Sequence, residues 1–432
     1  MLQTVEQDLQ LSFRPHVKTH KTIEGALLQT GGRRSKIVVS TIAELQFYDR
    51  AGFTDMVYAV PLAGLSKIDI LWTQFVAPQK DVTLVMDNVQ QLQQLETYLR
   101  RKQLNKRTTT TAKWKILLLL GVEPETLSSH VTAPTTTNPP SPPLLHQVGL
   151  DPTADTSFHL ATRLERAPYV DFQGVYLHAA HSYDATSQDA CTQAARDECT
   201  RIGTFVQRLR DEYQIRCKHV SVGSTPTCTN PAIYKDSGNN NGTKQELDLE
   251  LIQEVYTENG ITELHAGNYL VNDQMQWREI QSCTQDDVAL FVKTQVISSS
   301  HDELDNPTPT TLLIDCGWTG VSTQKQQTTA TDTETDTTGG GGYGVIVSHP
   351  ELQLVSLKQE TGEVHVVAPP QQQQPPPQQQ QQQQNYPRYP LGTTELTLVP
   401  YHACAAAQQY PCLYIENSHG ECIDVWTRCP SK

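Results

Sequence analysis

The stretch Arg14-Pro15-His16-Val17-Lys18-Thr19-His20-Lys21 is the part of this chain of 432 residues that says most about its fold and function. Read as a strand, it turns every second side chain, from Arg14 to His20, to one face, so that basic groups share one pocket wall. Neighbouring positive charge and burial both lower the pKa of a lysine, and a neutral Lys18 amine can form a Schiff base with an aldehyde cofactor. A solvated basic patch or a phosphate contact is the alternative interpretation of such a run.

Two later segments have the composition of an anion-binding loop. Val220-Ser221-Val222-Gly223-Ser224-Thr225-Pro226-Thr227 reads as a short strand that ends in a glycine and two hydroxyl residues. Gly223 lets the backbone approach closely, and the amides and hydroxyls of Ser224 and Thr225 can donate to phosphate oxygens. Glu263-Leu264-His265-Ala266-Gly267-Asn268-Tyr269 follows the same logic. For each segment alone, an ordinary turn is the alternative.

In this order, the three segments resemble the D-serine dehydratase family of pyridoxal-phosphate enzymes, which is related to alanine racemase and D-threonine aldolase. The resemblance implies that Lys18 binds the cofactor covalently. It implies that the cofactor phosphate is held by residues of the second and third segments: Gly223, Ser224, Thr225, Gly267, Asn268 and Tyr269. It also implies that Tyr176 and Tyr183 face the cofactor, with core packing as the alternative role for these aromatic side chains.

Pro400-Tyr401-His402-Ala403-Cys404 resembles the segment through which the dehydratases bind zinc. On an extended backbone, residues two apart point to one face, so His402 and Cys404 can meet one tetrahedral ion. Two protein ligands leave positions open for water or substrate, which suits catalysis. A buried cysteine beside an unrelated histidine is the alternative interpretation.

The resemblance implies a dehydratase that depends on pyridoxal 5'-phosphate and Zn²⁺ and converts D-serine, or another D-3-hydroxy amino acid, into a keto acid and ammonia. Lys18 would remove the Cα proton, and the zinc ion would assist the departure of hydroxide. A D-threonine aldolase is the nearest alternative, but Cys404 favours dehydration, because a thiolate prefers zinc to harder cations. The alternative outside the enzymes is a catalytically degenerate homologue that still binds the cofactor.

Composition excludes several kinds of partner. The formal net charge of −14 argues against nucleic acid. The longest apolar run, Ile116–Leu120, has the length of a strand, whereas a membrane span needs roughly 20 apolar residues. The ten cysteines lack the spacing of a disulfide scaffold, and the first eight residues lack a targeting pattern, so we expect a cytoplasmic protein. The resemblance implies a homodimer that acts on a small-molecule substrate.

Strand and helix patterns alternate through about residue 290, which predicts a parallel sheet. With cofactor residues at strand ends, we expect an α/β fold: a (β/α)8 TIM-type barrel over residues 1–288, followed by a C-terminal mainly-β domain over residues 289–432. Predicted barrel strands are Ile37–Ser40, Met56–Ala59, Val82–Met86, Trp114–Leu120, Phe172–Leu177 and His219–Val222, and predicted helices are Asn88–Leu104 and Gln188–Tyr213. Predicted strands of the second domain are Ala289–Ser298, Thr311–Ile314, Gly344–Ser348, Gln353–Lys358 and Thr397–Val399.

Three inserts and two departures from the family pattern complete the sequence analysis. Inserts at about 122–143, 324–342 and 368–388 lack the apolar content of a core, and we expect them to be disordered. Gln147 stands where relatives have an arginine that reaches the cofactor ring oxygen, which would remove a cationic partner. The alternative is that the preceding insertion has displaced this strand altogether. Only seventeen residues precede Lys18, whereas relatives carry an additional strand and most of a helix there, so we expect an unpaired edge in the β domain.

Overall fold

The computed structural model describes residues 1–104, 111–121, 149–185, 187–229, 234–235, 246–247, 253–300, 311–325, 342–367 and 389–430. Gln147 and the three inserts predicted to be disordered lie outside these residues, apart from the edges of the second insert. The chain forms two compact units, Met1–Tyr269 with Trp426–Lys432, and Leu270–Val425. The predicted domain boundary between residues 288 and 289 stays a prediction.

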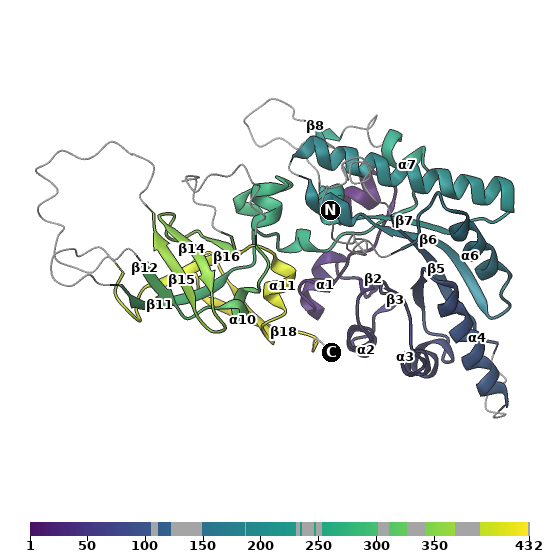
Figure 1. Cartoon of the computed structure of the whole chain (residues 1–432), viewed down its shortest axis with the longest axis horizontal. Coiled ribbons are helices and arrows are strands. Elements are labelled where there is room, and N and C mark those ends of the chain that lie inside the picture. Colours follow the sequence, from purple (N-terminus) through teal and green to yellow (C-terminus); the bar gives the residue numbers. More distant parts are fainter. Residues whose placement is uncertain are drawn as a thin grey trace, which may run out of the picture. The chain divides into compact units, whose positions relative to one another are not determined.

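A parallel barrel forms the first unit (Figure 1). Its strands are β1 (Ser12–Phe13), β2 (Ser35–Val39), β3 (Thr54–Tyr58), β4 (Val82–Met86), β5 (Trp114–Leu120), β6 (Val170–His178), β7 (His219–Gly223) and β10 (Glu263–Leu264). The sheet has eight parallel strands in the order β1-β10-β7-β6-β5-β4-β3-β2. A parallel bridge between His16 and Val38 joins its two ends, and the Val38 N–H donates to the Pro15 carbonyl at 2.9 Å. The predicted barrel is confirmed.

The barrel strands read as continuous apolar runs because both of their faces are covered. Every residue of β4 is buried, as expected for a parallel strand between a filled interior and an outer layer of helices. Alternate residues divide between two cores. On β2, Ile37 and Val39 join the large core of the unit, whereas Val38 joins a smaller cluster with Val57, Val85, Leu117, Leu119 and Tyr176. This smaller cluster forms a layer of the barrel interior.

The helices of the first unit begin at hydroxyl residues where the sequence supplies them. They are α1 (Ile23–Gln29), α2 (Ile42–Arg50), α3 (Leu65–Leu71), α4 (Val89–Leu104), α6 (Asp155–Arg166), α7 (Gln188–Tyr213) and α8 (Thr225–Thr229). Thr22, Thr41 and Ser187 accept backbone N–H groups at the starts of α1, α2 and α7, which satisfies donors that the helix leaves open. Shorter helical segments are η1 (Thr4–Asp8), η2 (Trp72–Val76), η3 (Ala180–Asp184) and η5 (Gln253–Thr257), and the two-residue strands β8 (Tyr234–Lys235) and β9 (Glu246–Leu247) pair antiparallel.

An antiparallel sheet of six strands forms the second unit, in the order β13-β16-β11-β12-β15-β14. The strands are β11 (Val292–Ser299), β12 (Thr311–Ile314), β13 (Gly344–Ile346), β14 (Leu352–Leu357), β15 (Gly362–Val366) and β16 (Glu395–Pro400), beside a separate pair of strands, β17 (Cys412–Glu416) and β18 (Cys422–Thr427). Two short helices, α10 (Trp318–Val321) and α11 (Ala403–Ala407), and the segments η6 (Asn268–Leu270), η7 (Met275–Glu279) and η8 (Gln285–Asp287) complete the described elements. In β11, buried Val292, Thr294 and Val296 alternate with exposed residues, the pattern of a strand with one covered face. The predicted mainly-β region is confirmed.

Across the described ranges, none of the helices is both long enough and apolar enough to cross a membrane.

Candidate active site

Lys18 lies in a loop, between β1 and α1. The strand ends at Phe13, although the Arg14 and His16 N–H groups still donate to the Leu264 and Ala266 carbonyls, at 2.9 and 2.8 Å. The Lys21 N–H donates to the Val17 carbonyl at 2.9 Å and closes a turn around Lys18. The interpretation of the quoted stretch as a strand therefore holds only as far as the bridge at His16.

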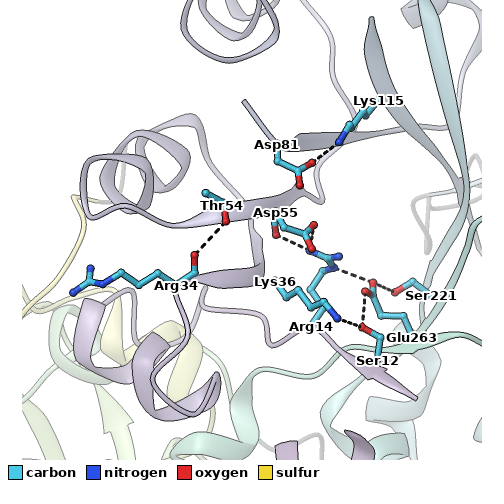
Figure 2. Close-up of polar contacts among 10 residues, drawn as sticks. All are labelled: Ser12, Arg14, Arg34, Lys36, Thr54, Asp55, Asp81, Lys115, Ser221 and Glu263. Carbon is cyan, nitrogen blue, oxygen red and sulfur yellow. Dashed lines mark hydrogen bonds and ion pairs between the residues drawn. The ribbon is translucent and has the colours of Figure 1, made fainter. Parts of the chain in front are cut away.

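The guanidinium of Arg14 forms ion pairs with two carboxylates near the starts of other barrel strands (Figure 2). Its Nη1 lies 2.8 Å from an Asp55 oxygen, and its Nε lies 2.9 Å from a Glu263 oxygen. Asp55 is near the beginning of β3 and Glu263 begins β10, so both carboxylates lie at the amino ends of parallel strands. The positive charge of Arg14 is compensated there, although the sequence alone had suggested that it shares one wall with Lys18.

We expect Arg14→Met to lower the free energy of unfolding by about 3–5 kcal/mol, because it leaves a buried carboxylate without its cation. Glu263 is 2% exposed, and the Arg14 side chain is 3% exposed. Urea unfolding followed by circular dichroism measures the effect. Adding Glu263→Gln to Arg14→Met should recover part of the lost stability, and a double variant that is no more stable than Arg14→Met would contradict this account.

Three imidazoles lie close to Lys18: those of His16 and His265 are buried, and that of His178 is partly buried. Burial, and after it the positive charge of Lys18, lower the pKa of His178 to about 4. Burial also lowers the pKa values of His16 and His265 well below the ordinary value, and the charge of Lys18 contributes to both shifts. All three imidazoles are therefore neutral at neutral pH. They supply no positive charge, which corrects the picture of a uniformly cationic wall.

The hydrogen bonds of His265 determine its tautomer. The Ser221 hydroxyl donates to Glu263 at 3.0 Å, because a carboxylate paired with Arg14 can only accept (Figure 2). Nδ1 of His265 lies 3.0 Å from the same hydroxyl oxygen, so it must be the nitrogen that carries the proton. Nε2 is then a bare acceptor, and it is buried with no hydrogen-bond partner among the described residues.

The two predicted phosphate-binding segments meet at the carboxyl ends of β7 and β10. The Asn268 N–H donates to the Thr225 hydroxyl oxygen at 3.0 Å, which leaves the Thr225 hydroxyl proton to donate elsewhere. Ser224 is engaged within the protein, since its N–H donates to the Thr227 hydroxyl at 3.2 Å and its own hydroxyl lies 2.7 Å from that of Ser182. Of the two hydroxyls expected here, that of Thr225 is the better placed to donate to a ligand.

Glycine is required in both segments because backbones pass very close together. A Cβ on Gly223 would lie 2.5 Å from the His265 carbonyl oxygen, and one on Gly267 would lie 2.5 Å from the His16 carbonyl oxygen. Gly223 also has a positive φ of 139°. The loop that carries Lys18 therefore packs directly against the loop at residues 266–268, and the His16 N–H donates to the Ala266 carbonyl at 2.8 Å.

Gln29 links the same two loops through side chains. The Thr22 N–H donates to Nδ1 of His20 at 3.1 Å, so His20 carries its proton on Nε2 and donates to the Gln29 side-chain oxygen at 3.0 Å. The Gln29 amide nitrogen in turn donates to the Gly267 carbonyl at 3.2 Å. The sequence offered no local signal for this connection.

The three predicted tyrosines lie in different surroundings. Tyr176 on β6 is buried and stacks on the His265 ring, with centroids 4.1 Å apart and planes inclined by 8°. Tyr183 lies in η3, with its ring 6.1 Å from the His178 ring. Tyr269 packs edge-on against Phe13 at 5.8 Å. Tyr176 and Tyr183 are thus beside the imidazoles that surround Lys18.

The predicted metal ligands lie in the second unit, at the start of α11. His402 is the extended residue before the helix, and Cys404 lies in its first turn, so the segment is not extended throughout as the spacing suggested. Although burial disfavours the charged imidazole, the Cys404 side chain and the Asp273 carboxylate outweigh it and raise the pKa of His402 to about 10. Within the described residues, no group of three or more potential metal-ligating side chains is found, so any metal here would rely on this pair.

Asp273 is a residue of this second site that sequence reasoning missed. It is completely buried, and one carboxylate oxygen lies 3.1 Å from Nδ1 of His402 and accepts the Ala403 N–H at 2.8 Å. Its other oxygen accepts the Gln276 N–H at 3.0 Å. A carboxylate beside Nδ1 keeps the proton there when His402 is neutral, so Nε2 is the nitrogen with a lone pair for a metal ion. Asp273 is 129 positions from His402, so no local motif connects them.

Comparison with known proteins agrees with this arrangement of the chain. Residues 2–238 match the family model "Alanine racemase, N-terminal domain", and residues 289–416 match the model "Putative serine dehydratase domain". A D-serine dehydratase from Dictyostelium discoideum is 23% identical over 424 residues, which covers 96% of this chain and 89% of that protein.

Two solved structures share the fold. That of D-threo-3-hydroxyaspartate dehydratase from Delftia sp. HT23 superposes with a TM-score of 0.70 at 24% identity and covers 99% of this chain and 92% of that chain. A cysteine-to-alanine mutant of D-threo-3-hydroxyaspartate dehydratase, solved in the metal-free form, superposes with a TM-score of 0.69 at 24% identity over the same shares of the two chains.

Proposed function

The chain belongs to the alanine racemase N-terminal domain family, and from this membership we propose that it is a pyridoxal-phosphate- and zinc-dependent dehydratase that converts D-serine into pyruvate and ammonia. The match to a serine dehydratase domain and the D-serine dehydratase among its relatives support this activity. The observation that carries the proposal is the meeting of three loops: the loop of Lys18 packs on Gly267, and Asn268 is bonded to Thr225.

The residues at these loops fit pyridoxal phosphate. The Thr225 hydroxyl proton and the bare Nε2 of His265 are polar groups that the described protein leaves for a ligand. Lys18 would bind the cofactor aldehyde through its amine, and Thr225, Gly267 and Asn268 would hold the phosphate. When bound, the cofactor supplies an electron sink for the charge that develops at the substrate Cα. The Lys18 amine, once released by the substrate amine, would accept the Cα proton.

The second site has the donor chemistry of a zinc site. Nε2 of His402 and the thiolate of Cys404 are ligands that zinc prefers, and two protein ligands leave coordination positions open. A zinc ion held there would supply Lewis acidity to the departing hydroxide, which is the poorest leaving group in the reaction. The metal-free form of a relative's cysteine mutant supports the assignment by analogy.

We expect Asp273→Asn to weaken zinc binding by roughly 10–100-fold, because an amide holds the His402 ring and tautomer less firmly than a carboxylate. Competition with a chromogenic chelator measures the affinity without reference to turnover. Asp286→Asn is the matched control, since Asp286 is an exposed aspartate of the same unit. Equal affinities in the two variants would show that Asp273 has no part in zinc binding.

A coupled assay for pyruvate tests the proposed reaction. Release of pyruvate from D-serine should disappear after treatment with a chelator and return when Zn²⁺ is added. Glycine and acetaldehyde from D-threonine would instead indicate the aldolase reaction. A bound chromophore without turnover of any D-3-hydroxy amino acid would indicate a degenerate homologue.

D-threo-3-hydroxyaspartate is the second candidate substrate, favoured by the Delftia relative that is named for it. Oxaloacetate would be the product from this substrate. The ratio of kcat/KM for D-serine to that for D-threo-3-hydroxyaspartate decides between the two substrates. Either result is consistent with a dehydratase.

We also propose that the enzyme is a homodimer, as the family resemblance implies, and that it is located in the cytoplasm. Light scattering should then give about twice the chain mass of 48.2 kDa. A mass equal to that of one chain would contradict the dimer.

A further inference from the structure

The C-terminal segment of the chain binds the loop that carries Lys18. Nε of Arg428 donates to the His20 carbonyl at 2.8 Å, and Nη2 of Arg428 reaches the Thr19 carbonyl at 3.3 Å. The Cys429 N–H donates to the Lys21 carbonyl at 2.8 Å. Three successive carbonyls of the loop are thus held by two neighbouring residues that belong to the same compact unit.

These bonds matter because the loop is buried away from water. Thr19 is 0% exposed and His20 is 1% exposed, so their carbonyls depend on partners within the protein. Arg428 is itself only 5% exposed. A guanidinium in this position makes charge-assisted hydrogen bonds, which are stronger than neutral ones, and its planar fork can reach two neighbouring carbonyls at once.

Further contacts hold two side chains of the loop and one more of its carbonyls. Nζ of Lys21 lies 3.0 Å from the buried carboxylate of Glu44 on α2, and His20 is bonded to Gln29 on α1. The Tyr48 hydroxyl donates to the Thr22 carbonyl at 3.1 Å. Bonds to carbonyls and to side chains therefore fix residues 19–22, which follow Lys18 directly.

We propose that Arg428, together with the Cys429 amide, is a positioning residue for Lys18: the C-terminal segment fixes the loop backbone and so determines where the Lys18 amine lies. The role of Lys18 rests on the proposed function, whereas the anchoring of the loop does not. Arg428 acts through the loop and makes no contact with the reacting atoms in this scheme.

Hydrogen exchange of the cofactor-free chain tests the anchoring by itself. In Arg428→Met, which keeps most of the side-chain volume, the Lys21 amide should exchange at least about tenfold faster, because the buried charge-assisted bonds are lost. Arg428→Lys keeps the charge but loses the forked guanidinium, so it should give an intermediate exchange rate. This variant provides the test if Arg428→Met does not fold. Arg210→Met is the control, since Arg210 is an exposed arginine on α7. Unchanged exchange in both Arg428 variants would overturn the proposal.

The absorbance of bound pyridoxal phosphate tests the consequence for Lys18. The pH midpoint of its absorbance change should shift in Arg428→Met, and the dissociation constant of the cofactor should rise about tenfold, with smaller effects in Arg428→Lys. A lower melting temperature with an unshifted midpoint would mean that Arg428 serves stability alone, and would overturn its positioning role. If the wild-type chain binds no cofactor, the proposed function fails, and the exchange rates still decide whether the segment anchors the loop.

Discussion

Lys18→Ala should abolish the absorbance of bound pyridoxal phosphate and reduce pyruvate formation from D-serine by roughly 10²–10⁴-fold or more. The loss combines the covalent attachment of the cofactor with the base that accepts the Cα proton, and a positioned base alone contributes a factor of this size. Lys18 lies in a turn beside three neutral imidazoles, so no neighbouring amine of that cluster can replace it. Absorbance spectra and a coupled pyruvate assay measure the two effects.

Two further variants make the Lys18 result specific. Lys18→Arg keeps the positive charge but cannot form the Schiff base, so it should resemble Lys18→Ala. Lys67→Ala changes an exposed lysine of the same unit and should retain both chromophore and activity. A Lys18→Arg variant with the wild-type chromophore would exclude Lys18 as the attachment site.

Cys404→Ala should keep the chromophore and lose the elimination reaction. We expect zinc content to fall to background and the rate with D-serine to fall by at least about 10²-fold, because Lewis-acid assistance to a poor leaving group contributes several kcal/mol to the transition state. Elemental analysis of the purified chain and the pyruvate assay measure these effects. Cofactor absorbance should be unaffected, since Cys404 is not among the residues proposed to bind it.

Cys422→Ala is the matched control for Cys404→Ala, because Cys422 is an exposed cysteine of the same unit. It should retain zinc and activity. Retention of both by Cys404→Ala would remove the metal role of this residue, and loss of zinc with full turnover would separate the metal from catalysis.

The regular elements of the barrel could be predicted closely from the sequence. β4, β5 and α7 begin and end at the predicted residues, because parallel strands covered on both faces give uninterrupted apolar runs and a long helix has a clear period. β15 was missed because Glu363 and His365 make Gly362–Val366 too polar to read as a strand, although Gly362 and Val364 are buried.

The sites could be predicted only in part, because their geometry depends on contacts between distant residues. Alternating basic residues made the Lys18 loop look like a strand, and only the structure shows that Arg14 turns to Asp55 and Glu263. The family resemblance indicated Thr225 and Asn268, and the structure joins them by a hydrogen bond. No sequence signal marked Asp273, which acts on His402 from another segment of the chain.

The bond between Arg428 and His20 joins residues 408 positions apart, and β1 pairs with β10 across most of the barrel sequence. During synthesis on the ribosome, the first strand and the lysine loop emerge long before β10 and Arg428, so they must wait for these partners. A nascent chain that has not reached residue 428 would therefore present a lysine loop without these anchors. Attachment of the aldehyde is expected to follow the folding of these distant segments onto the loop.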